Sequence, residues 1–102
     1  MNEQKYTLKA TVKKSADMIF FSQLDLGLVF ERSLRRAELP LYFTQGFRPH
    51  AKISFSRALK LGVEGEEEVT FYFTEKINPQ ELREKLETQL PCGLTLIEIK
   101  EF

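Results

Sequence analysis

The pattern of apolar and polar positions along the chain predicts four strands. Residues 6–14, 52–56 and 68–74 alternate between apolar and polar side chains, and residues 94–100 are expected to form the last strand. Alternation with a period of two is typical of a half-buried strand, whose successive side chains point to opposite faces. The apolar run 18–21 is expected to extend the first strand or to form a short second piece after a turn.

The segment that follows Ser22 predicts a first helix. Ser22 is a typical N-cap residue, and Asp25 stands three positions later, as in a capping box. Apolar side chains then recur at helical spacing as far as Pro40, which cannot continue a helix. They are Leu26, Val29, Phe30, Leu34 and Ala37. Gly27 lies inside this helix, at a cost of about 1 kcal/mol relative to alanine.

A second helix is predicted from capping signals and a leucine stripe. Asn78 is a good N-cap residue, Pro79 suits the first helical position, and Glu81 would complete a capping box. The buried edge is Leu82, Leu86 and Leu90. Pro91 and Gly93 then end the helix.

The order of these elements predicts an α+β, ferredoxin-like βαββαβ fold, a four-stranded antiparallel sheet with two helices on one face. The 102 residues, 42% of them apolar, are enough for a single domain with one core, residues 1–102. The expected outward face of the sheet carries hydroxyls and lysines. It comprises Thr7, Lys9, Thr11, Lys13, Lys52, Ser54, Ser56, Thr70, Tyr72 and Thr74.

The zero net charge conceals an uneven distribution. Residues 31–60 contain seven basic and two acidic side chains, a net charge of +5, whereas residues 61–102 contain four basic and ten acidic, a net charge of −6. Such asymmetry indicates an anionic partner for the basic part. The alternative is that the two halves pair with each other in the fold.

Composition excludes several classes of site. Cys92 is the only cysteine, so the chain has no internal disulfide framework and cannot build an iron–sulfur or zinc cluster from its own thiolates. No apolar run approaches the length that spans a membrane, and the first residues have no signal-peptide pattern. We therefore expect a cytoplasmic domain with no membrane contact.

The clearest candidate site is the loop before the second strand, which contains the only histidine, His50. Gly46 permits a positive φ or a close approach of the backbone to a ligand. Arg48, His50 and Lys52 alternate, so in an extended segment they would point the same way and form a cradle for phosphate or carboxylate. The predicted phosphate-binding residues are Gln45, Gly46, Arg48, His50 and Lys52, with Arg32, Arg35 and Arg36 extending the positive surface.

The pairing of the second and third strands bears on this site. If they pair across a turn near Val63, Ile53 lies near Phe73. The three glutamates at 66–68 would then form a solvated turn at the far end of the hairpin. They could not screen the basic loop, which is left for a ligand or for the helix arginines.

Four segments of the chain resemble the radical SAM-linked domain family, a family of unknown function. They lie at 20–26 (FFSQLDL), 30–40 (FERSLRRAELP), 44–55 (TQGFRPHAKISF) and 62–68 (GVEGEEE), so the resemblance spans roughly residues 18–68. Two positions depart from the family pattern. Gln23 replaces a usual histidine, and Ala51 replaces a usual proline.

The resemblance implies a function through a partner protein. The family is found fused to, or encoded beside, radical SAM proteins with a cobalamin-binding region, often near ribosomal and RNA-processing genes. It therefore implies a non-catalytic accessory domain that binds RNA, such as tRNA or rRNA, or another phosphate-bearing substrate. The iron–sulfur cluster, S-adenosylmethionine and cobalamin would belong to the partner, and no cofactor is expected in this chain. Since the family domain is typically longer, the chain is expected to be a short member or the N-terminal part of a longer domain.

Two other functions stay open on the residues alone. The basic helix face could dock on an acidic surface of the radical SAM partner without touching nucleic acid. Alternatively, His50 and Asp25 could serve a small-molecule site, a metal site or an enzyme. Ser22, Gln23 and Asp25 begin the first helix and are expected to line the same site as the loop.

Overall fold

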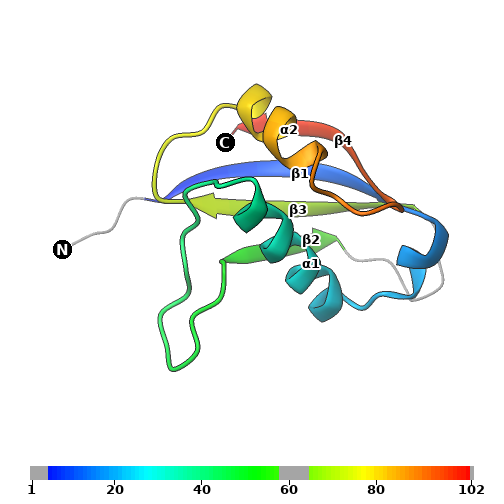
Figure 1. The fold of residues 1–102 in the computed structure, drawn as a ribbon, viewed down its shortest axis with the longest axis horizontal. Coiled ribbons are helices and arrows are strands. Elements are labelled where there is room, and N and C mark those ends of the chain that lie inside the picture. The colour runs from blue at the N-terminus through cyan, green and yellow to red at the C-terminus, as the bar shows by residue number, and fades with distance from the viewer. Residues whose placement is uncertain (1–4, 58–64, 102) are drawn as a thin grey trace.

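The computed structural model describes residues 5–57 and 65–101 and has the predicted order of elements (Figure 1). A short 3₁₀ helix, η1, precedes the first α-helix. The elements are β1 (Tyr6–Lys14), η1 (Ala16–Phe20), α1 (Gln23–Arg36), β2 (Ile53–Arg57), β3 (Gly65–Phe73), α2 (Pro79–Glu87) and β4 (Leu94–Glu101).

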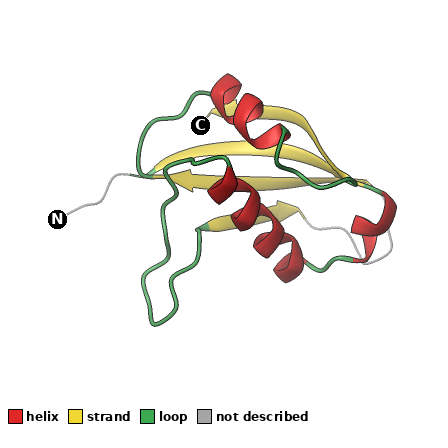
Figure 2. Ribbon diagram, viewed as in Figure 1, coloured by secondary structure: helices red, strands yellow, loops and turns green. Residues whose placement is uncertain are grey.

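The strands form one antiparallel sheet in the order β2-β3-β1-β4. Both α-helices cover the same face of this sheet, which leaves two layers (Figures 1 and 2). The split βαβ topology and the two-layer arrangement confirm the predicted ferredoxin-like α+β fold.

The core lies between the sheet and the two helices, on the face that the alternation predicts. In β1, Leu8, Ala10 and Val12 are at most 2% exposed, whereas Lys13, which follows Val12 and belongs to the other face, is exposed. The other central residues come from β3, β4 and both helices. They are Val69, Phe71, Phe73, Leu94, Leu96, Leu26, Phe30, Leu34, Leu82 and Leu86.

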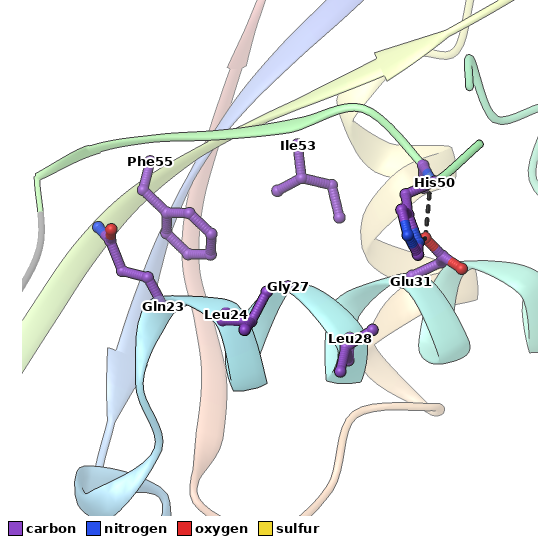
Figure 3. Close-up of a pocket in the computed structure, with 9 residues that line it drawn as sticks. Gln23, Leu24, Gly27, Leu28, Glu31, His50, Ile53 and Phe55 are labelled. Carbon is purple, nitrogen blue, oxygen red and sulfur yellow. Dashed lines mark hydrogen bonds and ion pairs between the residues drawn. The ribbon is translucent and has the colours of Figure 1, made fainter. Parts of the chain in front are cut away.

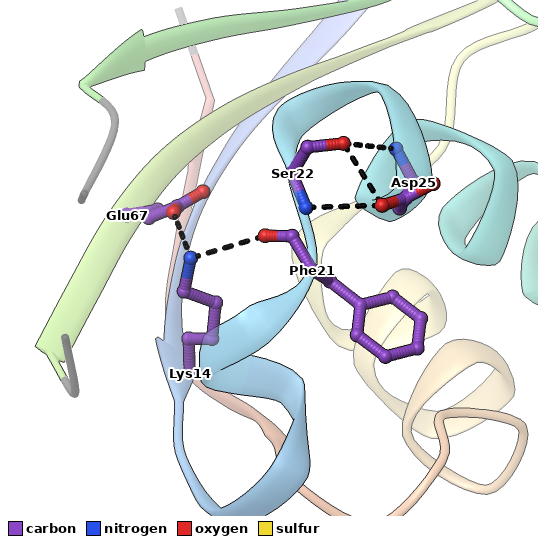
Figure 4. Close-up of polar contacts among 5 residues, drawn as sticks. All are labelled: Lys14, Phe21, Ser22, Asp25 and Glu67. Carbon is purple, nitrogen blue, oxygen red and sulfur yellow. Dashed lines mark hydrogen bonds and ion pairs between the residues drawn. The ribbon is translucent and has the colours of Figure 1, made fainter. Parts of the chain in front are cut away.

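Both helices begin where the capping signals predict. The Ser22 side chain accepts a hydrogen bond from the Asp25 N–H, and the Asp25 carboxylate accepts one from the Ser22 N–H, so the capping box is complete (Figure 4). At α2 the Asn78 side chain accepts from the Glu81 N–H at 2.7 Å. The Glu81 carboxylate contacts Lys85 at 3.0 Å, one turn along the helix.

The prediction of strand for residues 18–21 is wrong, because the segment 16–20 forms η1. Ala16 has a φ of 53°, which turns the chain directly after β1. The Ser15 N–H donates to the carbonyl of Gly93, and the Met18 N–H donates back to the Ser15 carbonyl, which closes the turn. The apolar pattern could not show this, because the turn depends on the contact with Gly93.

The predicted register between β2 and β3 is also wrong, by two residues. Ile53 is paired with Phe71 rather than Phe73, and the register shifts between Phe55 and Arg57. An offset of two residues leaves every side chain on its own face of the sheet. Alternation alone therefore cannot distinguish the two registers.

The glutamates at 66–68 do not form a solvated turn, because they belong to β3. Glu67 has the parity of the buried residues of β3 and is 3% exposed. Its Oε1 lies 3.2 Å from Nζ of Lys14, which is 1% exposed and also donates to the Phe21 carbonyl at 3.4 Å (Figure 4). Glu68 lies 3.8 Å from Lys9 on the outer face. The cluster is therefore paired with β1.

Candidate functional site

The loop between α1 and β2 extends away from the sheet (Figure 1). Its neck is closed by a bridge between Phe43 and Ala51. Within the neck, the Thr44 N–H donates to the His50 carbonyl at 2.7 Å, and the His50 N–H donates to Oγ1 of Thr44 at 3.1 Å. These bonds leave residues 45–49 as an exposed tip on a hydrogen-bonded base.

The tip presents an aromatic and a cationic side chain to solvent. Phe47 is 98% exposed, and Arg48 beside it is also exposed. Within residues 5–57 and 65–101, no carboxylate pairs with Arg48. Gly46 has a φ of 153°, as its position predicted. Gln45 also lies in the exposed tip.

The three predicted phosphate ligands do not converge. His50 turns toward α1, where its Nδ1 lies 3.7 Å from Oε1 of Glu31. Lys52 instead lies over the ring of Tyr72, with Nζ 4.9 Å from the centroid. Tyr72 shares the outer face of the sheet with Ser54, whose hydroxyl donates to it at 3.3 Å. The expected alternation, which would place His50 and Lys52 on one side, does not hold because Phe43 and Ala51 pair with each other in the neck of the loop.

Glu31 connects α1 to the loop through its side chain. No pattern in the sequence indicated this role. Its Oε1 accepts the N–H of Ala51 at 2.7 Å, and its Oε2 lies 3.3 Å from Arg35. The Arg35 guanidinium also lies over the ring of Phe43 at 5.0 Å. The Glu31 side chain is only 15% exposed, so this carboxylate is largely enclosed by its partners.

The other two arginines of α1, Arg32 and Arg36, are exposed. In the described part of the chain, no carboxylate after residue 64 pairs with any arginine of α1 or with Arg48. The ion pairs of that half join Glu67 and Glu68 to β1, and the others to lysine or arginine within α2 and within β4. Among the described residues, Arg32, Arg36 and Arg48 are thus left without a carboxylate partner.

A pocket of about 260 Å³ lies between α1 and β2, next to the neck of the loop (Figure 3). Gln23 stands at one end beside Phe55, and His50 with Glu31 stands at the other. The lining residues are Gln23, Leu24, Gly27, Leu28, Glu31, His50, Ala51, Ile53 and Phe55. The structure therefore brings Gln23 and His50, two predicted site residues, to one cavity.

Ser22 and Asp25, the other predicted lining residues, are engaged with each other. The Asp25 carboxylate also accepts from the Ser22 hydroxyl at 2.9 Å, and neither residue lines the pocket. The carboxylate beside His50 is that of Glu31. Among the residues that the structure describes, no three His, Cys, Asp or Glu side chains gather as a metal site, and no helix is long and apolar enough to cross a membrane.

Comparison with known proteins places the chain in a family. Residues 7–102 match the family described as "Uncharacterized protein conserved in bacteria (DUF2344)". The chain belongs to the DUF2344 family. No curated protein and no solved structure matches it. Because the family description assigns no activity, the partnership with a radical SAM protein and the binding of RNA stay predictions.

The sequence reasoning missed several residues of this region. Phe47 had a usable signal, because it is an aromatic residue between glycine and arginine in a polar loop. Gly27 was noticed only as a cost to the helix, although a Cβ at this position would meet nothing within 4 Å. Leu24 and Leu28, which are 77% and 43% exposed, belong to the pocket wall and had no separate signal.

Proposed function

We propose that this domain binds single-stranded RNA and presents it to a radical SAM enzyme, which performs the chemistry. The observation that carries the proposal is the tip of the loop, where Phe47 is 98% exposed beside the exposed Arg48. Sites for single-stranded nucleic acid combine basic side chains for the backbone with aromatic rings on which bases stack. An isolated, fully exposed phenylalanine has no role in the core of this domain.

The electrostatics support the same ligand. Arg32, Arg36 and Arg48 are exposed cations with no carboxylate partner in the described ranges. A polyanion would supply the countercharge and would release its own counterions on binding. The role of the radical SAM partner rests on the family resemblance, since this chain has one cysteine and no cluster motif.

The proposal is tested by fluorescence anisotropy with labelled tRNA and a ribosomal RNA fragment at two salt concentrations. We compare the wild-type chain with the double variant Arg32→Ala/Arg48→Ala. The affinity of the wild type should fall with salt, with a log–log slope of about −0.7 per phosphate contact on single strands. The variant should bind more weakly and with a slope shallower by about 1.4, since it lacks two contacts of about 0.7 each.

The matched control removes two positive charges elsewhere. Lys76→Ala/Lys100→Ala has the same net charge as the test variant, and both lysines are exposed. Equal losses in the two variants would show nonspecific attraction and would contradict a site on the loop and α1. Absence of wild-type binding at low salt would overturn the RNA proposal altogether.

Two exposed apolar residues favour a second candidate, docking on the enzyme partner. Phe20, the last residue of η1, is 66% exposed, and Leu24, in the first turn of α1, is 77% exposed. Exposed apolar surface is typical of sites of protein contact. Co-purification of the partner that is lost in Phe20→Ser, with RNA binding retained, would support this candidate beside the first.

A further inference from the structure

We propose that the pocket between α1 and β2 receives one unpaired nucleobase of the RNA, an inference that rests on the proposed function. The pocket has two apolar walls (Figure 3). Leu24 and Leu28 come from α1, and Ile53 and Phe55 come from β2. Phe55 is held from behind by Phe30, with ring centroids 6.3 Å apart, so its ring is a fixed surface.

Gly27 gives the pocket its depth. It lies in the second turn of α1, between the two leucines in sequence, and a Cβ built on it would meet nothing within 4 Å. A helix-interior glycine normally costs stability relative to alanine. Here its missing side chain leaves space inside the cavity rather than permitting a close helix contact.

The volume of the pocket limits the size of the ligand that it can hold. Sites for drug-sized ligands measure about 300–1,000 Å³, and this pocket of about 260 Å³ falls just below that range. It suits a single flat ring system between two apolar walls. An extended apolar helix or an acyl chain would overfill it.

The polar groups stand at the two ends, where the edge of a base would carry its donors and acceptors. Gln23 offers an amide with a donor and an acceptor at one end, and the exposed His50 ring stands at the other, beside the Glu31 carboxylate that Ala51 and Arg35 already engage. Unstacked bases are recognised by hydrogen bonds to their edges together with packing on their faces. His50, 59% exposed, lies at the mouth on the loop side.

The basic side chains of the loop and α1 lie on the same side of the molecule as the end of the pocket that His50 and Glu31 form. His50 lies two residues from Arg48, and Arg35 contacts Glu31 of the pocket wall and is 54% exposed. A strand whose phosphates follow the loop and α1 would therefore pass the pocket mouth. This arrangement favours a nucleotide over a neutral ligand.

The test compares a labelled oligoadenylate of about ten nucleotides, within the size range of single-strand sites, with an abasic ribose-phosphate strand of the same length. Wild-type protein should bind the oligoadenylate about a hundredfold more tightly than the abasic strand, since the abasic strand lacks both the base in the pocket and the base on Phe47, and each contact accounts for roughly tenfold. Gly27→Leu places a side chain in the pocket and should weaken binding of the oligoadenylate by about tenfold, while its affinity for the abasic strand stays that of the wild type. Its salt slope should stay unchanged, because the phosphate contacts remain.

The control is Gln80→Leu, which adds a leucine to an exposed position of α2 and should bind like the wild type. A readout on the wild type guards against misfolding of the pocket variant. In ¹⁵N-resolved NMR spectra, the Gly27 amide and the Gln23 side-chain amide should shift with oligoadenylate and not with the abasic strand.

The outcomes separate the two proposals. If Gly27→Leu binds the oligoadenylate as tightly as the wild type does, and the wild-type spectra show no shift at Gly27 or Gln23, the pocket inference is overturned and RNA binding stands. If the wild type binds neither strand at low salt, both proposals fail. A shift at Gly27 together with a loss of affinity in Gly27→Leu would establish the base pocket.

Discussion

The carboxylate of Glu31 accepts the backbone N–H of Ala51 at 2.7 Å, across 20 positions of sequence. This bond ties the exposed side of α1 to the neck of the loop, at the point where the bridge to Phe43 closes it. The same carboxylate contacts Arg35 and His50. One acidic side chain of α1 therefore links the helix to the neck of the loop.

Replacing Glu31 by alanine should destabilise the domain and loosen the loop. A hydrogen bond to a charged group contributes about 1.5–3 kcal/mol, and we expect a loss of about that size in urea unfolding. Hydrogen exchange at the Ala51 amide should become faster than in the wild type. Glu31→Gln keeps an acceptor oxygen and should retain slow exchange. Equal protection of Ala51 in all three proteins would contradict this role.

The buried pair of Lys14 and Glu67 should be sensitive to removal of either partner. Lys14→Met removes the buried ammonium that contacts the Glu67 carboxylate, and removal of one partner of a buried pair costs about 3–5 kcal/mol. The double variant Lys14→Met/Glu67→Leu removes both charges and should recover most of that loss. Chemical denaturation of the three proteins measures the effect. A single variant within about 1 kcal/mol of the wild type would show that the pair is weaker than its burial indicates.

Two glycines should respond in opposite ways to alanine. Gly27→Ala gains helix propensity with free space for its Cβ, so the free energy of unfolding should rise by about 1 kcal/mol. Gly93→Ala should lower it, because Gly93 has a φ of 100° and its Cβ would lie 2.7 Å from Cγ of Met18 and from the Ser15 carbonyl. Thermal unfolding of the pair tests this. A stabilised Gly93→Ala variant would contradict the geometry of the turn.

The exposed ring of Phe47 should contribute to RNA affinity and not to stability. Stacking of a base on an aromatic ring contributes about 1–3 kcal/mol, so Phe47→Ser should weaken binding of single-stranded RNA by about tenfold. Its melting temperature should equal that of the wild type, since the side chain contacts no core residue at 98% exposure. Phe20→Ser, at another exposed phenylalanine, is the matched control and should bind RNA normally. A similar loss in both variants would remove the specific role of the tip.

The sequence by itself determined the local features of this protein. Strand alternation, the Ser22 capping box and the Asn78 cap act over a few residues, so their signals are present in short stretches and led to the correct fold class. The same short-range periodicity indicates which side chains lie on the apolar face of each strand and helix. The exposed arginines of α1 were likewise readable from their place off the apolar stripe.

Only the tertiary structure decided which residues meet. The register of β2 on β3 is shifted by two residues from the predicted one, and periodicity is blind to such a shift. Burial of Glu67 depends on Lys14 lying on the neighbouring strand. Contacts between α1, the loop and β2 separate His50 from Lys52. The same contacts bring His50, Glu31 and Gln23 around one pocket. These contacts join positions far apart in the chain, and no short-range pattern of side chains encodes them.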